Sequence, residues 1–111
     1  MGTESLAEFE LLVMLSALRL GPEEAYAVSI AEDIHARTGR VVRRANVYTT
    51  LQRLETKGFI TSMLGEPRAE RGGRPPRLVE VEPAGLQAVR ATTQAIHAMS
   101  GELGHLLGGV R

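Results

Sequence analysis

The chain has 111 residues, 43% of them hydrophobic, and its thirteen basic and thirteen acidic residues give a formal net charge of zero. This length predicts one compact unit with a buried core, and the absence of cysteine excludes disulfides and thiolate metal sites. No apolar run reaches the roughly 18 residues that span a bilayer, and the acidic start is unlike a signal peptide, so we expect a cytoplasmic protein with no membrane partner.

Three helices are predicted in the first half of the chain. The first, over residues 6–20, has Ser5 and Glu8 at capping-box spacing. It is apolar on nearly every side, which predicts that a partner subunit covers it as well as the chain's own core. The second covers residues 24–38, with its apolar face inward and Gly39 after its end. The third covers residues 45–57 and is closed by Gly58.

The third helix has a polar stripe beside its apolar stripe. Val47, Leu51 and Leu54 lie within about 60° of one another and predict the buried side. The neighbouring stripe carries the kinds of groups that bind base edges and phosphates, and it consists of Asn46, Thr50, Arg53 and Lys57, with Thr49 at its edge. A polar outer face without a ligand is the alternative interpretation.

The residues around this stripe favour an anionic ligand. Arg43 and Arg44 stand directly before the helix, where the positive end of the helix dipole adds to their attraction for phosphate. Tyr48 is either a core residue or a hydroxyl that binds phosphate.

After the third helix the hydrophobic period changes to that of strands. Residues 59–65 and 77–82 predict two strands, joined by a hairpin loop over residues 66–76 that is longer than usual. In and after this loop an arginine recurs every three residues, at Arg68, Arg71, Arg74 and Arg77. Such a loop could lie along a DNA backbone or enter a narrow minor groove, and a disordered charged loop is the alternative.

The positive charge of the chain is concentrated in this region. Ten of the thirteen basic residues lie between Arg37 and Arg77 against three acidic ones, so the segment carries +7, whereas residues 1–36 carry −6 and residues 78–111 carry −1. A concentrated basic region indicates a polyanionic partner, although a solvated surface is the alternative. The predicted DNA-binding residues are Arg43, Arg44, Asn46, Tyr48, Thr49, Thr50, Arg53, Lys57, Arg68, Arg71, Arg74 and Arg77.

Pro83 begins a last helix that is predicted over residues 83–107. Its apolar residues alternate at three and four positions, which is typical of a coiled-coil seam: Val89, Thr92, Ile96, Met99, Leu103 and Leu106. Packing on the chain's own core is the alternative, and the two can coexist. The predicted homodimer interface consists of Leu12, Leu15, Val89, Ile96, Met99, Leu103 and Leu106.

The order of these elements predicts an α+β fold that is mostly α. Residues 1–82 form a winged helix-turn-helix DNA-binding domain, and residues 83–111 form a C-terminal dimerisation helix. The histidines are His35, His97 and His105, none at metal-ligand spacing from a partner, and there is no phosphate loop or nucleophile elbow. We therefore predict no enzyme, no metal and no cofactor. A winged helix that binds another protein instead of DNA is the alternative function.

Several segments resemble the PadR family of bacterial transcriptional regulators. Residues 46–60, NVYTTLQRLETKGFI, are similar to that family's recognition helix, and residues 65–77 to its wing. Residues 82–86, EPAGL, are similar to the start of its final helix, and residues 9–18 to its first helix. The resemblance covers essentially the whole chain, and the short C-terminal part is similar to the smaller members.

The resemblance implies a homodimer that binds inverted repeats in promoters, usually as a repressor released by a small molecule. The sequence does not show whether an effector exists; a small-molecule effector of unknown identity would be sought in a cavity between the first and last helices of the dimer. Three features depart from the family's pattern. Residues 43–45, RRA, lack the capping hydroxyl that is common before the recognition helix. Glu82 replaces the usual threonine cap, and the chain has no tryptophan on which a flat drug could stack.

Overall fold

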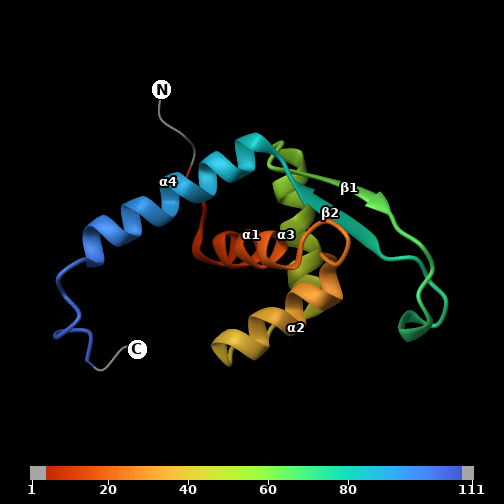
Figure 1. The fold of residues 1–111 in the computed structure, drawn as a ribbon, viewed down its shortest axis with the longest axis horizontal. Helices are drawn as coiled ribbons and strands as arrows, with labels where there is room; N and C mark the ends of the chain where they lie inside the picture. The colour runs from red at the N-terminus through yellow and green to blue at the C-terminus, as the bar shows by residue number, and fades with distance from the viewer. Residues whose placement is uncertain (1–4, 109–111) are drawn as a thin grey trace.

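The computed structural model describes residues 5–108 and has the predicted winged helix-turn-helix architecture (Figure 1). The predicted fold class is confirmed, because four helices accompany one two-stranded antiparallel sheet. In chain order, the elements are α1 (Glu8–Leu20), α2 (Ala27–Thr38), α3 (Arg44–Thr56), β1 (Ile60–Leu64), a short 3₁₀ helix (Ala69–Arg71), β2 (Arg77–Val81) and α4 (Pro83–Ser100).

Helix α1 lies at the centre of the core and packs against α2, α3, α4 and strand β2. Val13 and Met14 of α1 are fully buried, as are Ile30 of α2 and Leu54 of α3. Burial of each such side chain contributes about 1.5–3 kcal/mol. Most of the apolar surface of α1 is therefore covered by its own chain. Two of its leucines remain in contact with solvent, Leu15 at 36% and Leu18 at 40% exposure.

The two strands form a hairpin that is tied to the body of the domain by its backbone. Ile60 pairs with Val81 and Leu64 pairs with Arg77 in the antiparallel register. The N–H of Val79 in β2 donates to the carbonyl of Ala25 at 2.9 Å. Because Ala25 lies between α1 and α2, this bond fixes the hairpin to the segment that precedes α2.

The first two helices start later than predicted, for reasons of capping. Helix α1 begins at Glu8, and the N–H of Ala7 donates to the Glu10 carboxylate at 2.9 Å. The predicted capping box of Ser5 and Glu8 is therefore wrong, and Glu8 forms an ion pair with Arg40 instead, at 3.0 Å. Helix α2 begins at Ala27, because residues 22–24 form a turn after α1.

The last helix is shorter than predicted. Helix α4 ends at Ser100, and Gly101 follows with φ −59° and ψ 143°, outside the helical region. Glycine weakens a helix by about 1 kcal/mol relative to alanine, and the chain has two within four residues, Gly101 and Gly104. Leu103 and Leu106 lie beyond the helix, so the predicted helical seam of three heptads is wrong at its C-terminal end.

The start of α4 is packed directly against the end of α3 and the start of the hairpin. The N–H of Glu82 donates to the carbonyl of Phe59 at 2.9 Å. In the first turn of α4, a Cβ atom on Gly85 would clash with the carbonyl oxygen of Phe59 and would lie 2.8 Å from the terminal carbon of Met14. The absence of a side chain at residue 85 therefore permits this contact.

Further along, α4 also contributes to the core. Val89 is only 5% exposed, and Thr92 accepts a hydrogen bond from the buried N–H of Leu6 at 3.1 Å. These two residues of the predicted seam face their own chain, as the alternative interpretation of this helix requires. None of the helices among the described residues is both long and apolar enough to cross a membrane.

Candidate nucleic-acid interface

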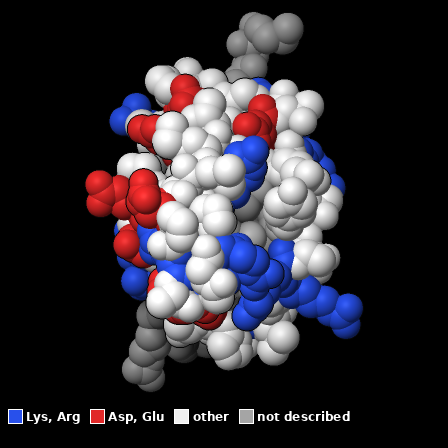
Figure 2. Space-filling model, turned by 90° about the vertical axis from the view of Figure 1, so that its right-hand side faces the viewer, with Lys and Arg blue, Asp and Glu red and all other residues white. Residues whose placement is uncertain are grey.

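One end of the molecule gathers basic side chains from α3 and the hairpin. Figure 2 shows this end, with Lys and Arg side chains across its middle and lower parts and acidic side chains mostly towards one edge. Part of the +7 excess between residues 37 and 77 is offset by ion pairs with acidic residues from outside that segment, such as Arg40 with Glu8 and Arg68 with Glu24.

Helix α3 presents a polar face to solvent at this end. Asn46, Thr49 and Arg53 are exposed, as the sequence predicted, and Gln52 is exposed as well. Tyr48 is 51% exposed and is not a core residue, which decides between its two predicted roles in favour of the surface. Gln52 was not among the predicted DNA-binding residues, because the polar stripe predicted from the sequence was centred too close to the buried side of the helix.

Two predicted members of the stripe turn inward. Thr50 is only 5% exposed, so the prediction that it lies on the outer face is wrong. The Lys57 ammonium lies 3.1 Å from the carboxylate of Glu10 in α1, and its side chain is 25% exposed. The Lys57 side chain thus faces α1, a contact that the pattern of a single amphipathic helix cannot reveal.

The Glu10–Lys57 ion pair holds the C-terminal end of α3 against α1. Burial raises the pKa of Glu10, but the N–H of Ala7, the ammonium of Lys57 and the charge of Arg53 together lower it by more, so its pKa lies below the ordinary value of 4.5. The carboxylate is therefore ionised near neutral pH and keeps both partners.

The N-terminal end of α3 is open to an anion. Arg43 and Arg44 are exposed, and no side chain of the described residues caps the N-terminus of this helix. The first N–H groups of a helix need acceptors, and the helix dipole attracts negative charge to the same place. The predicted loss of a capping hydroxyl before this helix is confirmed.

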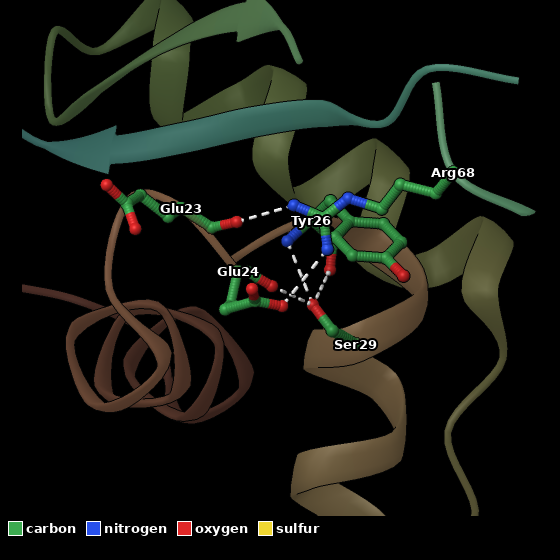
Figure 3. Close-up of polar contacts among 5 residues, drawn as sticks. All are labelled: Glu23, Glu24, Tyr26, Ser29 and Arg68. Carbon is green, nitrogen blue, oxygen red and sulfur yellow. Dashed lines mark hydrogen bonds and ion pairs between the residues drawn. The ribbon is translucent and has the colours of Figure 1, made fainter. Parts of the chain in front are cut away.

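The arginine-bearing loop is not an open hairpin, because Arg68 docks it onto the start of α2 (Figure 3). One Arg68 nitrogen lies 3.1 Å from the Glu24 carboxylate, and another donates to the carbonyl of Glu23 at 2.6 Å. The guanidinium also lies 5.6 Å from the ring centre of Tyr26. With 22% of its side chain exposed, Arg68 anchors the loop in this structure.

The other three loop arginines differ from Arg68 and from one another. The Arg71 guanidinium lies 5.1 Å from the ring centre of Tyr26, and its Nε atom is buried without a hydrogen-bond partner among residues 5–108. Arg74 and Arg77 are exposed, and Arg74 donates to the carbonyl of Arg71 at 3.0 Å. The sequence predicted that all four arginines bind DNA, whereas in the fold Arg68 and Arg71 also support the loop.

A pocket of about 370 Å³ lies between α2, α3 and the hairpin. Its apolar lining includes Val28, Leu51 and Val79. Its polar lining includes both tyrosines of the chain, two arginines, an amide and a carboxylate: Tyr26, Tyr48, Arg71, Arg77, Gln52 and Glu55. No sequence signal pointed to this pocket, because its walls come from four separate segments.

Solved structures with a similar fold include PadR-family transcriptional regulators. A PadR family transcriptional regulator from Eggerthella lenta is 25% identical, with a TM-score of 0.66 over 93% of this chain and 88% of that chain. A PadR-like transcriptional regulator from Bacillus cereus is 18% identical, with a TM-score of 0.69 over 90% of this chain and 94% of that one. A PadR family regulator from Clostridium difficile is 19% identical, with a TM-score of 0.67 over 88% and 98%.

The chain has the fold of the PadR-family transcriptional regulators. The resemblance found in the sequence is confirmed by these structures, although no protein-family model and no curated protein sequence matches the chain. The neighbours support a DNA-binding transcriptional regulator, and proteins of this class are generally not enzymes. Within residues 5–108, no group of three or more His, Cys, Asp or Glu is arranged to hold a metal ion.

The residues predicted to form the dimer interface fall into two sets by their exposure to solvent. Val89 is buried in the chain's own core, and Leu12 is half-buried. The others are exposed to different extents: Leu15 at 36%, Ile96 at 52%, Met99 at 80%, Leu103 at 38% and Leu106 at 70%. An open apolar groove of about 490 Å³ lies along the C-terminal part of α4, lined by Ile96, Met99, Leu103 and Leu107 among others. The predicted DNA-binding domain begins at residue 1, and the predicted dimerisation segment ends at residue 111. Residues 1–4 and 109–111 lie outside the described residues.

Proposed function

We propose that this chain is a sequence-specific transcriptional regulator that acts as a homodimeric repressor in the cytoplasm. The observation that carries the proposal is the exposed polar face of α3, made by Asn46, Thr49 and Arg53, between two pairs of exposed arginines. Arg43 and Arg44 precede this face, and Arg74 and Arg77 follow it in the hairpin. Residues 1–82 would bind DNA, and residues 83–111 would hold the dimer.

Helix α3 has the size and chemistry to enter a major groove. Its 13 residues make a rod about 20 Å long, and a helix fits the groove's width of about 12 Å. Arg53 and Asn46 carry the side chains that pair with guanine and adenine edges. The flanking arginines would bind phosphates, which supplies affinity that does not depend on sequence.

The exposed apolar residues of α4 favour a two-fold dimer. Ile96 and Met99 stand on one face of the helix, beside the open groove that reaches Leu103 and Leu107. In a two-fold dimer, two copies of α3 would reach successive major grooves roughly 34 Å apart. Such a dimer would bind an inverted repeat, and binding over a promoter would repress transcription.

The decisive experiment selects bound sequences from a random duplex pool and then measures variants on the selected site and on random DNA. Arg53→Ala should cost about 1–3 kcal/mol on the selected site and relax base choice at one position. Arg74→Ala should weaken binding to all duplexes alike and lower the salt slope by about one. Arg90→Ala removes an exposed charge on α4 and serves as the control.

Two outcomes would contradict the proposal. Failure of the selection to enrich any sequence would exclude sequence-specific recognition. Binding of a protein partner with an affinity that does not change with salt would favour the alternative of a protein-interaction module. A reporter gene under the selected site would then distinguish repression from activation.

A further inference from the structure

We propose that the pocket between α3 and the hairpin is a binding site for a small organic anion with an apolar body, and that this ligand excludes DNA. The pocket volume of about 370 Å³ falls within the range of about 300–1,000 Å³ that is usual for small-molecule sites. It lies within a single chain, between the recognition helix and the wing. The position differs from the cavity between the first and last helices where an effector would be sought from the sequence.

The apolar part of the lining selects for more than a bare anion. Val28, Leu51 and Val79 come from α2, α3 and β2 and all border the same space. A phosphate group alone would need only hydrogen-bond donors. Aliphatic side chains gain free energy only when they exclude water from an apolar surface. The aliphatic part of the lining therefore favours a ligand that carries a hydrocarbon body as well as a charge.

The basic part of the lining supplies the group that would hold the ligand's charge. Arg71 and Arg77 both border the pocket, and neither forms an ion pair within residues 5–108. The Nε atom of Arg71 is buried and has no hydrogen-bond partner there. Because that atom is buried, a carboxylate in the pocket would bind the other guanidinium nitrogens of Arg71 and those of Arg77. Guanidinium groups bind carboxylates through two parallel hydrogen bonds.

One acidic residue in the lining limits how negative the ligand can be. The Glu55 carboxylate accepts hydrogen bonds from the Ser62 hydroxyl at 3.1 and 3.2 Å. Two arginines against this one carboxylate give the lining a balance of +1. A monoanion matches that balance, whereas a dianion would leave one charge without a partner.

Occupancy of the pocket would interfere with DNA binding directly. Tyr48 and Gln52 belong to the exposed side of α3, and Arg77 belongs to the hairpin. The same side chains cannot contact a ligand and a DNA strand at once. This part of the inference rests on the proposed function, whereas the ligand site itself does not.

The chain provides its own probe for this site. Both of its tyrosines line the pocket and it has no tryptophan, so tyrosine fluorescence reports on the pocket without labels. The full-length protein is titrated, without DNA, with three carboxylates of increasing apolar size: acetate, cyclohexanecarboxylate and adamantane-1-carboxylate. Affinity should rise along the series, with one ligand per chain. The neutral amide of the largest ligand should bind about tenfold more weakly, because it loses a charge-assisted hydrogen bond.

Variants assign the site to the named residues. Arg77→Ala changes an exposed strand residue and should weaken adamantane-1-carboxylate about tenfold. Arg90→Ala removes an equal charge from α4 and should leave the affinity unchanged. Ile96→Asp, which is designed to abolish dimers, should retain one ligand per chain if the site lies within a single subunit.

Several results would overturn the inference. Equal binding of all three carboxylates would show that the site binds any anion and that the apolar lining contributes nothing. Equally strong binding of inorganic phosphate would show the same. A lack of saturable change at millimolar ligand would exclude the site. Loss of binding in Ile96→Asp would move the ligand to the dimer interface. Failure of DNA binding alone would leave these titrations intact, whereas ligand binding without any loss of DNA affinity would contradict only the competition.

Discussion

Gly85 shows how a single residue sets the position of an element. It lies in the first turn of α4, where the backbone carbonyl of Phe59 occupies the space that a Cβ atom would need. A carbonyl on the backbone cannot swing away as a flexible side chain can. The segment EPAGL, which carried part of the family resemblance, therefore includes one residue whose identity follows from packing.

Gly85→Ala should destabilise the protein by about 1–3 kcal/mol, the usual cost of inserting an atom into a packed interior. Urea unfolding followed by circular dichroism would measure this. Gly104→Ala is the matched control, because a Cβ atom there meets nothing within 4 Å, and it should change stability by less than about 0.5 kcal/mol. Equal effects of the two substitutions would mean that the neighbours of Gly85 move aside at little cost.

Residue-by-residue roles were the hardest part to predict. Arg68 and Arg74 have the same chemistry and the same spacing in the sequence, yet the first is docked on Tyr26 and Glu24 and the second is exposed. The difference arises from contacts between residues more than forty positions apart. Thr50 was misplaced for a similar reason, since its burial depends on how α3 sits against the rest of the domain.

At the scale of elements, the hairpin loop is held by one cluster. Arg68 contacts Glu23, Glu24 and Tyr26, and a 3₁₀ turn over residues 69–71 follows directly. The N–H of Gly73 donates to the carbonyl of Arg68 at 2.9 Å, so the reversal of the chain is tied to the same residue. Docking at Arg68 thus fixes where Arg74 and Arg77 are presented.

Arg68→Ala should release this loop without unfolding the protein. Amide hydrogen exchange at Gly72 and Gly73 should become faster, because their acceptors lie in the released turn. Affinity for all duplexes should fall, since exposed arginines on a mobile loop lose more conformational entropy on binding. Arg74→Ala should reduce DNA affinity while leaving the exchange rates unchanged. Unchanged exchange in Arg68→Ala would mean that the loop is held by something other than this cluster.

The order and type of the elements were predictable, whereas several of their ends were not. Hydrophobic periodicity reports which residues are apolar over a long stretch, and it placed the four α-helices and both strands, but not the short 3₁₀ helix. The ends depend on single contacts. At α1 the Glu10 carboxylate, and not Ser5, forms the capping contact by accepting from the N–H of Ala7, and at α4 Gly101 stops the helix before the leucines that follow.

The whole molecule places its basic end far from the exposed apolar residues of α4. Figure 1 shows the hairpin and the C-terminal part of α4 at opposite ends of the long axis, and the principal extents of 49 × 36 × 20 Å leave room for two independent contacts. An arrangement of this kind lets one end bind DNA while the other binds a second copy. The pocket and its ligand would act at the first end only.

Ile96→Asp should abolish the proposed dimer, because it places a charge in the apolar face of α4. Sedimentation at micromolar concentration should then report a monomer, and affinity for the inverted repeat should fall because two linked contacts become one. Gln94→Asp adds the same charge at an exposed position on another side of the helix and should preserve the dimer. A wild-type protein that sediments as a monomer would overturn the proposed assembly.

The Glu10 carboxylate could link the exposed leucines of α1 to the DNA-binding helix α3. One of its oxygens accepts from Ala7 at the start of α1, and the other binds Lys57 just after the end of α3. The start of one helix and the end of another are thereby joined at a single point, so that α1 and α3 should move as one rigid body. Because the pKa of Glu10 is lowered in the folded state, this joint is fully formed above the ordinary glutamate value and weakens as the pH falls through the lowered pKa. A shift of the exposed leucines on α1 during assembly would then be carried to the recognition helix without any change in the core between them.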